Sequence, residues 1–236
     1  MFRLLTISGL LCCGTVSVAG PLLDATALLT KPGKLLFSED LTEVPHERDK
    51  QNKIRRGGWQ SGKGKWEIKD GVLVGAEKLE DKHGAMLTKP GLPFHNAAVQ
   101  ISFRLDGARA ITLDANSQML GRIIAVTVTS TSLKLSVSLS GGDKMDVLDT
   151  VPLKLESGTW HTLVLEMQGT NVLASIDGRE VVFGTHERVN VDKNSVQLRV
   201  GGESVAFKNL RVWETVPNDA WAATKAKLLN ERPTKK

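Results

Sequence analysis

The sequence has no tyrosine and only two cysteines among its 236 residues, and aromatic residues make up 5% of it. Both cysteines, Cys12 and Cys13, lie in an apolar stretch near the N-terminus. If that stretch is removed, the remaining chain has no thiol. Such a chain cannot form disulfides, zinc-thiolate sites or a cysteine nucleophile.

Long apolar runs are also missing. Arg3 precedes an apolar stretch from Leu4 to Val18, which is shorter than the roughly 20 residues needed to cross a bilayer. Ser17-Val18-Ala19 has the small-x-small pattern that signal peptidase accepts. We therefore expect residues 1–19 to be a signal peptide cleaved after Ala19, and the protein to be secreted or periplasmic, with no permanent membrane anchor. Lipid attachment at Cys12 or Cys13 is the less favoured alternative, because Leu11 is not a small residue.

No strong charge of one sign is present. The chain has 31 basic and 26 acidic residues, so its net charge of +5 is modest. Nucleic-acid-binding proteins usually concentrate basic residues in a patch, and the basic residues here are spread along the chain. We therefore expect no nucleic-acid partner.

Familiar catalytic motifs are absent as well. The sequence contains no Gly-x-Ser-x-Gly elbow, no phosphate-binding Gly-rich loop and no His-Glu-x-x-His pattern. The nearest match to the acid triad of laminarinase-like enzymes, Glu47, Asp49 and Asn52, lacks its third acid. We predict no dedicated metal site and no cofactor, and leave a requirement for a divalent metal open.

What the sequence does contain is regular alternation of apolar and polar residues. Val99, Ile101, Phe103 and Leu105 alternate with polar neighbours, and similar patterns recur to about residue 213 between turn signals such as Asp177-Gly178. Many short strands without intervening helices predict an all-β fold, a two-sheet sandwich or jelly roll.

The same patterns divide the chain. We expect a leader over 20–34, a β-sandwich domain over 35–216 whose first strand spans 34–40, and a basic, Gly-rich loop over 45–65. Helical spacing of apolar residues after Pro217 predicts a short helix in a C-terminal segment over 217–236.

Polar residues on two neighbouring predicted strands suggest a site. If these strands form a hairpin, Arg104, Asp114 and Asn116 share one sheet face, because their apolar neighbours must face the core. Arg104 would then anchor a hydroxyl or oxyanion, Asp114 would act as base or hydroxyl acceptor, and Asn116 would orient a sugar. An ordinary cross-strand ion pair is the alternative.

Loops are expected to complete this site. Trp59 is the best candidate for stacking on a sugar, and His83 or His95 would lie at the rim. The other strand tryptophans, Trp66, Trp160 and Trp213, are expected in the core.

Three stretches resemble a known family: WEIKDGVLVG (66–75), GTWHTLVLEMQGTNVLASIDGREVVFG (158–184) and SVQLRVGGESVAFKNLRVWE (195–214). They look like the secreted 3-keto-disaccharide hydrolase family, which is abundant in planctomycete-like bacteria. The resemblance runs from about Leu35 to Glu214. It implies a concanavalin A-like jelly roll, a carbohydrate or glycoside ligand, and cleavage of a glycosidic bond next to a sugar oxidised at C3.

Other functions remain open from the sequence. The chain could be a non-catalytic glycan-binding module, or a structural or interaction protein of the cell envelope. The lack of a recognisable acid pair favours binding, whereas the resemblance favours hydrolysis. The sequence predicts neither the substrate nor the oligomeric state.

Overall fold

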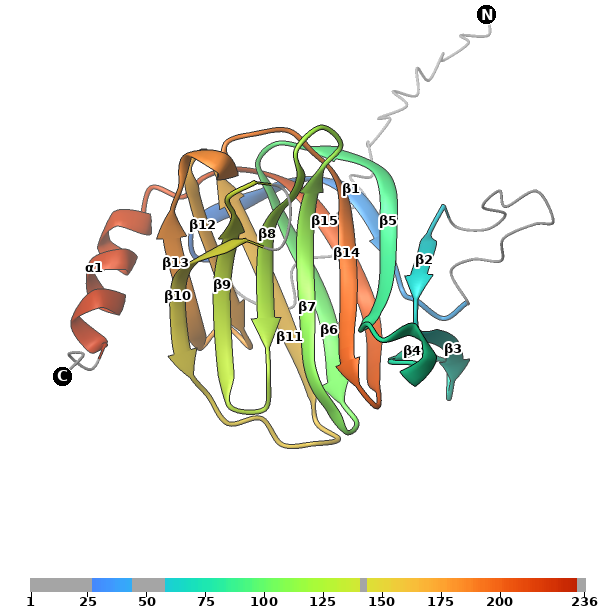
Figure 1. Ribbon diagram of the computed structural model, residues 1–236. Coiled ribbons are helices and arrows are strands. Elements are labelled where there is room, and N and C mark those ends of the chain that lie inside the picture. Colours follow the sequence, from blue (N-terminus) through green and yellow to red (C-terminus); the bar gives the residue numbers. More distant parts are fainter. Residues whose placement is uncertain (1–26, 44–57, 141–143, 233–236) are drawn as a thin grey trace, which may run out of the picture.

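A computed structural model describes residues 27–43, 58–140 and 144–232, and there the chain forms two antiparallel β-sheets stacked face to face (Figure 1). The eight-stranded sheet contains β1 (Thr30–Glu39), β3 (Lys65–Lys69), β4 (Val72–Ala76), β6 (Ala97–Leu105), β11 (Trp160–Gln168), β12 (Asn171–Ile176), β13 (Glu180–Thr185) and β15 (Val205–Pro217). The seven-stranded sheet contains β2 (Gln60–Lys63), β5 (Ala85–Phe94), β7 (Ala108–Ser117), β8 (Gly121–Val128), β9 (Ser132–Ser138), β10 (Met145–Pro152) and β14 (Lys193–Gly202). Two 3₁₀ turns, Leu79–Asp81 and Glu187–Val189, and one helix, α1 (Trp221–Glu231), complete the described elements.

The strand order is that of a jelly-roll sandwich. It is β13-β12-β11-β6-β15-β4-β3 in the larger sheet, with β1 also paired to β15, and β10-β9-β8-β7-β14-β5-β2 in the smaller sheet. The predicted all-β two-sheet sandwich with a short C-terminal helix is therefore confirmed. No helix in the described residues is long and apolar enough to span a bilayer.

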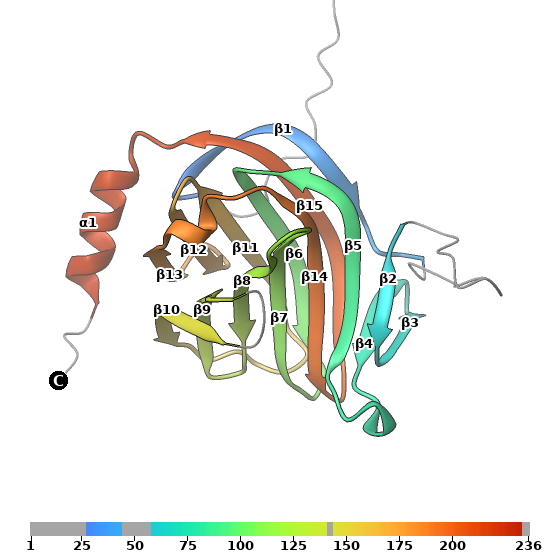
Figure 2. The ribbon, with the colours of Figure 1, turned by 45° about the horizontal axis from the view of Figure 1, so that its top comes forward.

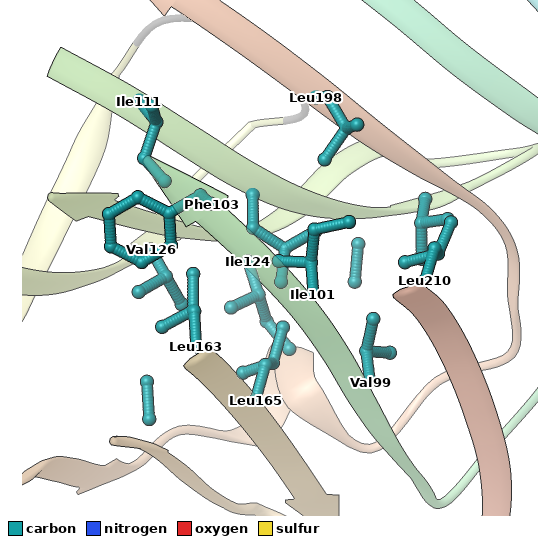
Figure 3. Close-up of a cluster of buried hydrophobic side chains, with 14 of the residues drawn as sticks. Val99, Ile101, Phe103, Ile111, Ile124, Val126, Leu163, Leu165, Leu198 and Leu210 are labelled. Atoms are coloured by element: carbon teal, nitrogen blue, oxygen red, sulfur yellow. The ribbon is translucent and has the colours of Figure 1, made fainter. Parts of the chain in front are cut away.

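The core lies between the two sheets. Figure 3 shows apolar side chains of β6 and β11, such as Ile101 and Leu165, facing those of β7, β8 and β14, such as Ile124 and Leu198. These side chains come from every second position of their strands, as the alternation predicts. The polar positions between them therefore point to the outer faces of the sandwich.

One predicted pairing is wrong. The strands that carry Arg104 and Asp114 do not form a hairpin, because β6 pairs with β11 and β15, whereas β7 pairs with β8 and β14. The chain crosses from one sheet to the other between Leu105 and Ala108. Alternation shows that each strand has one apolar face, but this is equally satisfied when the strands belong to opposite sheets and face each other across the core.

Three strands were not identified from the sequence. Pro90 and Pro93 interrupt the alternation in β5, and most side chains of β10 are at least partly exposed. The predicted loop over 45–65 is wrong at its end, because Gln60–Lys63 pair with β5 as the edge strand β2. Residues 45–57 of that loop, with Glu47, Asp49 and Asn52, lie outside the described part, as does the predicted signal peptide.

The N-terminal segment and α1 pack together against the outer face of the larger sheet. Leu29, Leu173, Val181 and Phe183 form a small apolar cluster that Trp221 and Leu228 of α1 contact. Figures 1 and 2 show α1 beside β13, at the end of the sandwich. The helix is thus attached along one side, and none of its residues is fully buried.

Candidate functional site

The outer face of the seven-stranded sheet carries a group of polar side chains on β7, β8 and β14. Asp114 of β7 lies opposite Ala125 of β8 and Gln197 of β14. Arg199 and Arg122 occupy the neighbouring rows, opposite Thr112 and Asn116 respectively. Asp114 is therefore diagonal to one arginine on each adjacent strand.

The three charged groups are in contact. Arg199 Nη2 donates a hydrogen bond of 2.9 Å to Asp114 Oδ1, and its Nε lies 2.6 Å from Oδ2. Arg122 Nε lies 3.7 Å from Oδ1. We refer to Asp114, Arg122 and Arg199 as the arginine–aspartate cluster.

Burial within the cluster is uneven. Asp114 is fully buried, whereas the side chains of Arg199 and Arg122 keep 22% and 19% exposure. Burial raises the pKa of the Asp114 carboxyl, and the two guanidinium groups oppose that rise. The groups of the cluster that reach solvent are therefore cations.

Neutral hydrogen-bonding groups surround the cluster. Asn116 Nδ2 lies 3.4 Å from Ser195 Oγ, in position to donate to it, and the hydroxyl oxygens of Thr112 and Thr127 are 3.2 Å apart. This face offers guanidinium, amide and hydroxyl groups together. Such a mixture suits a ligand rich in oxygen atoms.

The predicted trio of Arg104, Asp114 and Asn116 does not converge. Asp114 and Asn116 share the outer face of the smaller sheet, as predicted. Arg104 lies on β6 in the opposite sheet, where it pairs with Asp106 at 2.8 Å. The prediction is wrong for Arg104, because its strand and β7 belong to different sheets.

Trp59 does not provide a stacking surface. Its side chain is completely buried in the core, and its indole Nε1 donates a hydrogen bond of 2.9 Å to Glu39 Oε2. The expectation of an exposed ring in a loop is wrong, because Trp59 immediately precedes the edge strand β2 and turns inward. Trp66 and Trp213 are buried as expected, whereas Trp160 stays partly exposed.

The two candidate histidines lie beyond opposite ends of β5. Since β5 has ten residues, they are roughly 30 Å apart and cannot border the same point. His95 lines a cavity of about 490 Å³ together with Ser117 and Asn194, the chain neighbours of Asn116 and Ser195. His83 contacts Gly84 O at the other end.

His95 belongs to a small hydrogen-bonded group. Its Nδ1 lies 2.7 Å from Asp192 Oδ1, and its Nε2 lies 2.9 Å from Asn190 Oδ1. Because His95 shares a cavity with Ser117 and Asn194, it is the candidate histidine that lies next to the Asn116 end of the polar face.

No group of three or more His, Cys, Asp or Glu side chains in the described residues could hold a metal ion. What the polar face presents is a set of hydrogen-bond donors, two of them cationic.

The sequence analysis did not identify Arg199 or Arg122. Arg199 stands between Leu198 and Val200, so its polar phase on β14 was visible in the alternation. Its contact with Asp114, however, joins residues 85 positions apart. That pairing depends on the order of strands in the sheet, which alternation does not encode.

Several solved structures share this architecture. A galectin-like protein of unknown function from Bacillus subtilis superposes with a TM-score of 0.58 at 14% identity, covering 80% of this chain and 100% of its own. A carbohydrate-binding module from the same species gives 0.56 at 14%, covering 66% and 96%. An endo-β-1,3-glucanase from Pyrococcus furiosus gives 0.54 at 13%, covering 78% and 95%. At such low identity these similarities establish the fold alone.

No curated protein sequence matches the chain. A family match is nevertheless clear: residues 53–213, which make up 161 of the 236 positions, match the 3-keto-alpha-glucoside-1,2-lyase-like domain. This range contains the arginine–aspartate cluster and two of the three stretches that suggested the resemblance, together with nearly all of the third. The chain belongs to the family defined by the 3-keto-alpha-glucoside-1,2-lyase-like domain.

Proposed function

We propose that this protein is an exported, carbohydrate-active enzyme that cleaves glycosides of 3-keto sugars by elimination, on the outer face of the seven-stranded sheet. The observation that carries this proposal is the arginine–aspartate cluster, found on the polar face of a domain that belongs to a lyase-like family.

The chemistry follows from the ketone. A carbonyl at C3 acidifies the hydrogen on C2, so a base can remove that proton and leave an enolate whose negative charge rests on the C3 oxygen. The bond from C1 to the glycosidic oxygen then breaks, its electron pair leaves with the aglycone, and the aglycone takes up a proton. A double bond remains between C1 and C2, and addition of water to it gives the free 3-keto sugar.

Arg199 is the residue we assign to the C3 oxygen. Two of its nitrogens, Nε and Nη2, face Asp114, so Nη1 is not used in that pair. A fixed cation near the oxygen stabilises the enolate more than the ketone, because the negative charge develops only during the reaction. The partial burial of Arg199 strengthens this interaction relative to water.

Asp114 is assigned a positioning role in place of the predicted role as base. Its carboxylate is fully buried beneath the two guanidinium groups and faces them. It can therefore hold Arg199 in one orientation, but it does not reach a ligand on the surface. Asn116, whose side chain is partly exposed, remains suited to bind a sugar hydroxyl.

A non-catalytic glycan-binding module is the second candidate. One observation favours it: the carboxylate of the cluster is buried, so the cluster itself presents no exposed base. The same cations and amide could then hold a sugar without reaction.

A synthetic aryl 3-keto-α-glucoside tests the proposal, because release of the phenol is measured by absorbance. We expect wild-type protein to release it and to leave the unoxidised aryl α-glucoside intact, in assays run with and without added divalent metal. Arg199→Gln should lower kcat by about 100-fold, the usual effect of losing one oxyanion donor. Arg109→Gln is the matched control, since Arg109 is 75% exposed and lies at the start of β7, away from the cluster.

The outcomes separate the two candidates. Binding of the 3-keto-glucoside without release, weakened by Arg199→Gln, would establish the binding module instead. Equal activity of the Arg199→Gln and wild-type proteins would refute the assignment of Arg199.

A further inference from the structure

The outer face of the eight-stranded sheet carries a second cluster of polar and aromatic side chains, formed by Arg104, Trp160 and Lys208. Trp160 of β11 lies directly opposite Arg104 of β6. Lys208 of β15 is paired with Ser102, two residues from Arg104 on the same face. These residues lie on the sheet that does not carry the arginine–aspartate cluster.

Both cations contact the indole ring. Lys208 Nζ is 4.2 Å from the centroid of the Trp160 ring, and Arg104 Cζ is 5.1 Å from it. Trp160 keeps part of its surface exposed, unlike Trp59, Trp66 and Trp213. A partly exposed indole flanked by two cations is therefore present on this face.

The two cations differ in how firmly they are held. Arg104 donates through Nε and Nη2 to the carboxylate of Asp106 at 2.8 to 3.0 Å, and Asp70 also attracts it electrostatically. Its charge is thus balanced, and its side chain is fixed against the ring. Lys208 has no ion-pair partner in the part of the chain that the structure describes, and its recorded contact is with the indole.

This difference makes Lys208 the group that can exchange partners. A cation–π contact at an exposed position is weak, and the lysine side chain is long and flexible. An anionic group arriving at this face can draw the ammonium off the ring. The ring face that is then uncovered can pack against the C–H groups of a sugar, while Arg104 Nη1, which Asp106 does not use, can donate to a hydroxyl.

We propose that Arg104, Trp160 and Lys208 form a second carbohydrate site, which binds an anionic polysaccharide through one acidic group on Lys208 and one sugar ring on Trp160. The site is separate from the proposed reaction centre and would hold the protein on a polymer. Carboxylated and sulfated polymers offer the same charge to an ammonium group, so both are included in the test.

Affinity electrophoresis and calorimetry with full-length protein would test this site, using polygalacturonate, dextran sulfate, uncharged dextran and single-stranded DNA. We expect binding to at least one of the two anionic polymers, weakening with added salt, and no measurable binding to dextran. Lys208→Gln should weaken binding about threefold and Trp160→Ala about tenfold. The unfolding midpoint of each variant shows whether it remains folded, and Lys208→Gln, a change on the surface, should not affect it.

Lys225→Gln is the matched control, because Lys225 Nζ also lies over an aromatic ring, 5.8 Å from that of Phe183, but on α1. It should bind like wild type, as should Arg199→Gln. Unchanged binding in Lys208→Gln and Trp160→Ala, equal binding of dextran, or tighter binding of single-stranded DNA than of either acidic polymer would overturn the proposal. If the wild-type protein bound the polymer but did not cleave the aryl 3-keto-α-glucoside, the proposed function alone would be refuted.

Discussion

Replacing Asp114 with asparagine removes one negative charge from between two arginines while keeping the size of the side chain. Asp114 is completely buried, and Arg199 approaches its two oxygens at 2.6 and 2.9 Å. Removing one partner of a buried ion pair leaves the other charge uncompensated, which typically costs about 3–5 kcal/mol. With a urea m-value of about 2 kcal/mol per molar, the unfolding midpoint should fall by about 2 M.

Asp219→Asn provides the comparison, because the ion pair of Asp219 with Lys31 has the same 2.6 Å separation but is exposed to solvent. Its unfolding midpoint should stay close to that of wild type. Urea unfolding followed by tryptophan fluorescence measures all three proteins. If Asp114→Asn were as stable as wild type, Asp114 would carry no charge in the folded protein, and the reasoning about the cluster would be refuted.

Three further predictions concern other parts of the fold. Burial lowers the pKa of Lys193 to about 8, below its value in an unfolded chain, so the unfolded state binds more protons above pH 8. In chemical unfolding between pH 8 and 10, the free energy of unfolding of wild type should therefore rise relative to that of Lys193→Met by up to about 1.4 kcal/mol per pH unit. The same pH dependence in both proteins would contradict this. Glu166 accepts hydrogen bonds from the amide and hydroxyl of Thr30 at 2.8 and 2.7 Å. Glu166→Gln should therefore lower the free energy of unfolding by about 1–3 kcal/mol and speed hydrogen exchange of the Thr30 amide. Unaltered exchange at Thr30 would contradict this. A Cβ at Gly75 would clash with the ring carbons of Trp66, so Gly75→Ala should lower the free energy of unfolding by about 1–3 kcal/mol. Thermal unfolding would show no shift if the ring can move aside.

Most strands could be predicted because each has one face in the core, which the alternation of residues such as Ile111 and Leu113 reports directly. The three strands that alternation did not identify, β2, β5 and β10, lie at or next to the edges of the smaller sheet. β2 is short and polar, and β5 contains two prolines. The same limit explains the misplaced Arg104: alternation gives the face of a strand but not the sheet to which it belongs.

The candidate site shows a similar division. Asp114 and Asn116 were identified because their polar phase on one strand is visible locally. Arg199 was not connected with them, because β7 and β14 are adjacent in the sheet but far apart in the chain. The burial of Asp114 was also beyond the sequence, since a position on the outer face of a sheet is normally expected to be exposed.

The position of β15 has a consequence for the order of folding. This last strand lies inside its sheet, where it pairs with β6 and β4 and also carries β1 from the start of the described chain. None of these pairings can form before residues 205–217 have been synthesised, so β1 and the β3–β4 pair join the larger sheet late, through pairings between segments far apart in sequence. Truncation before Val205 should therefore yield a chain that cannot complete its larger sheet at all.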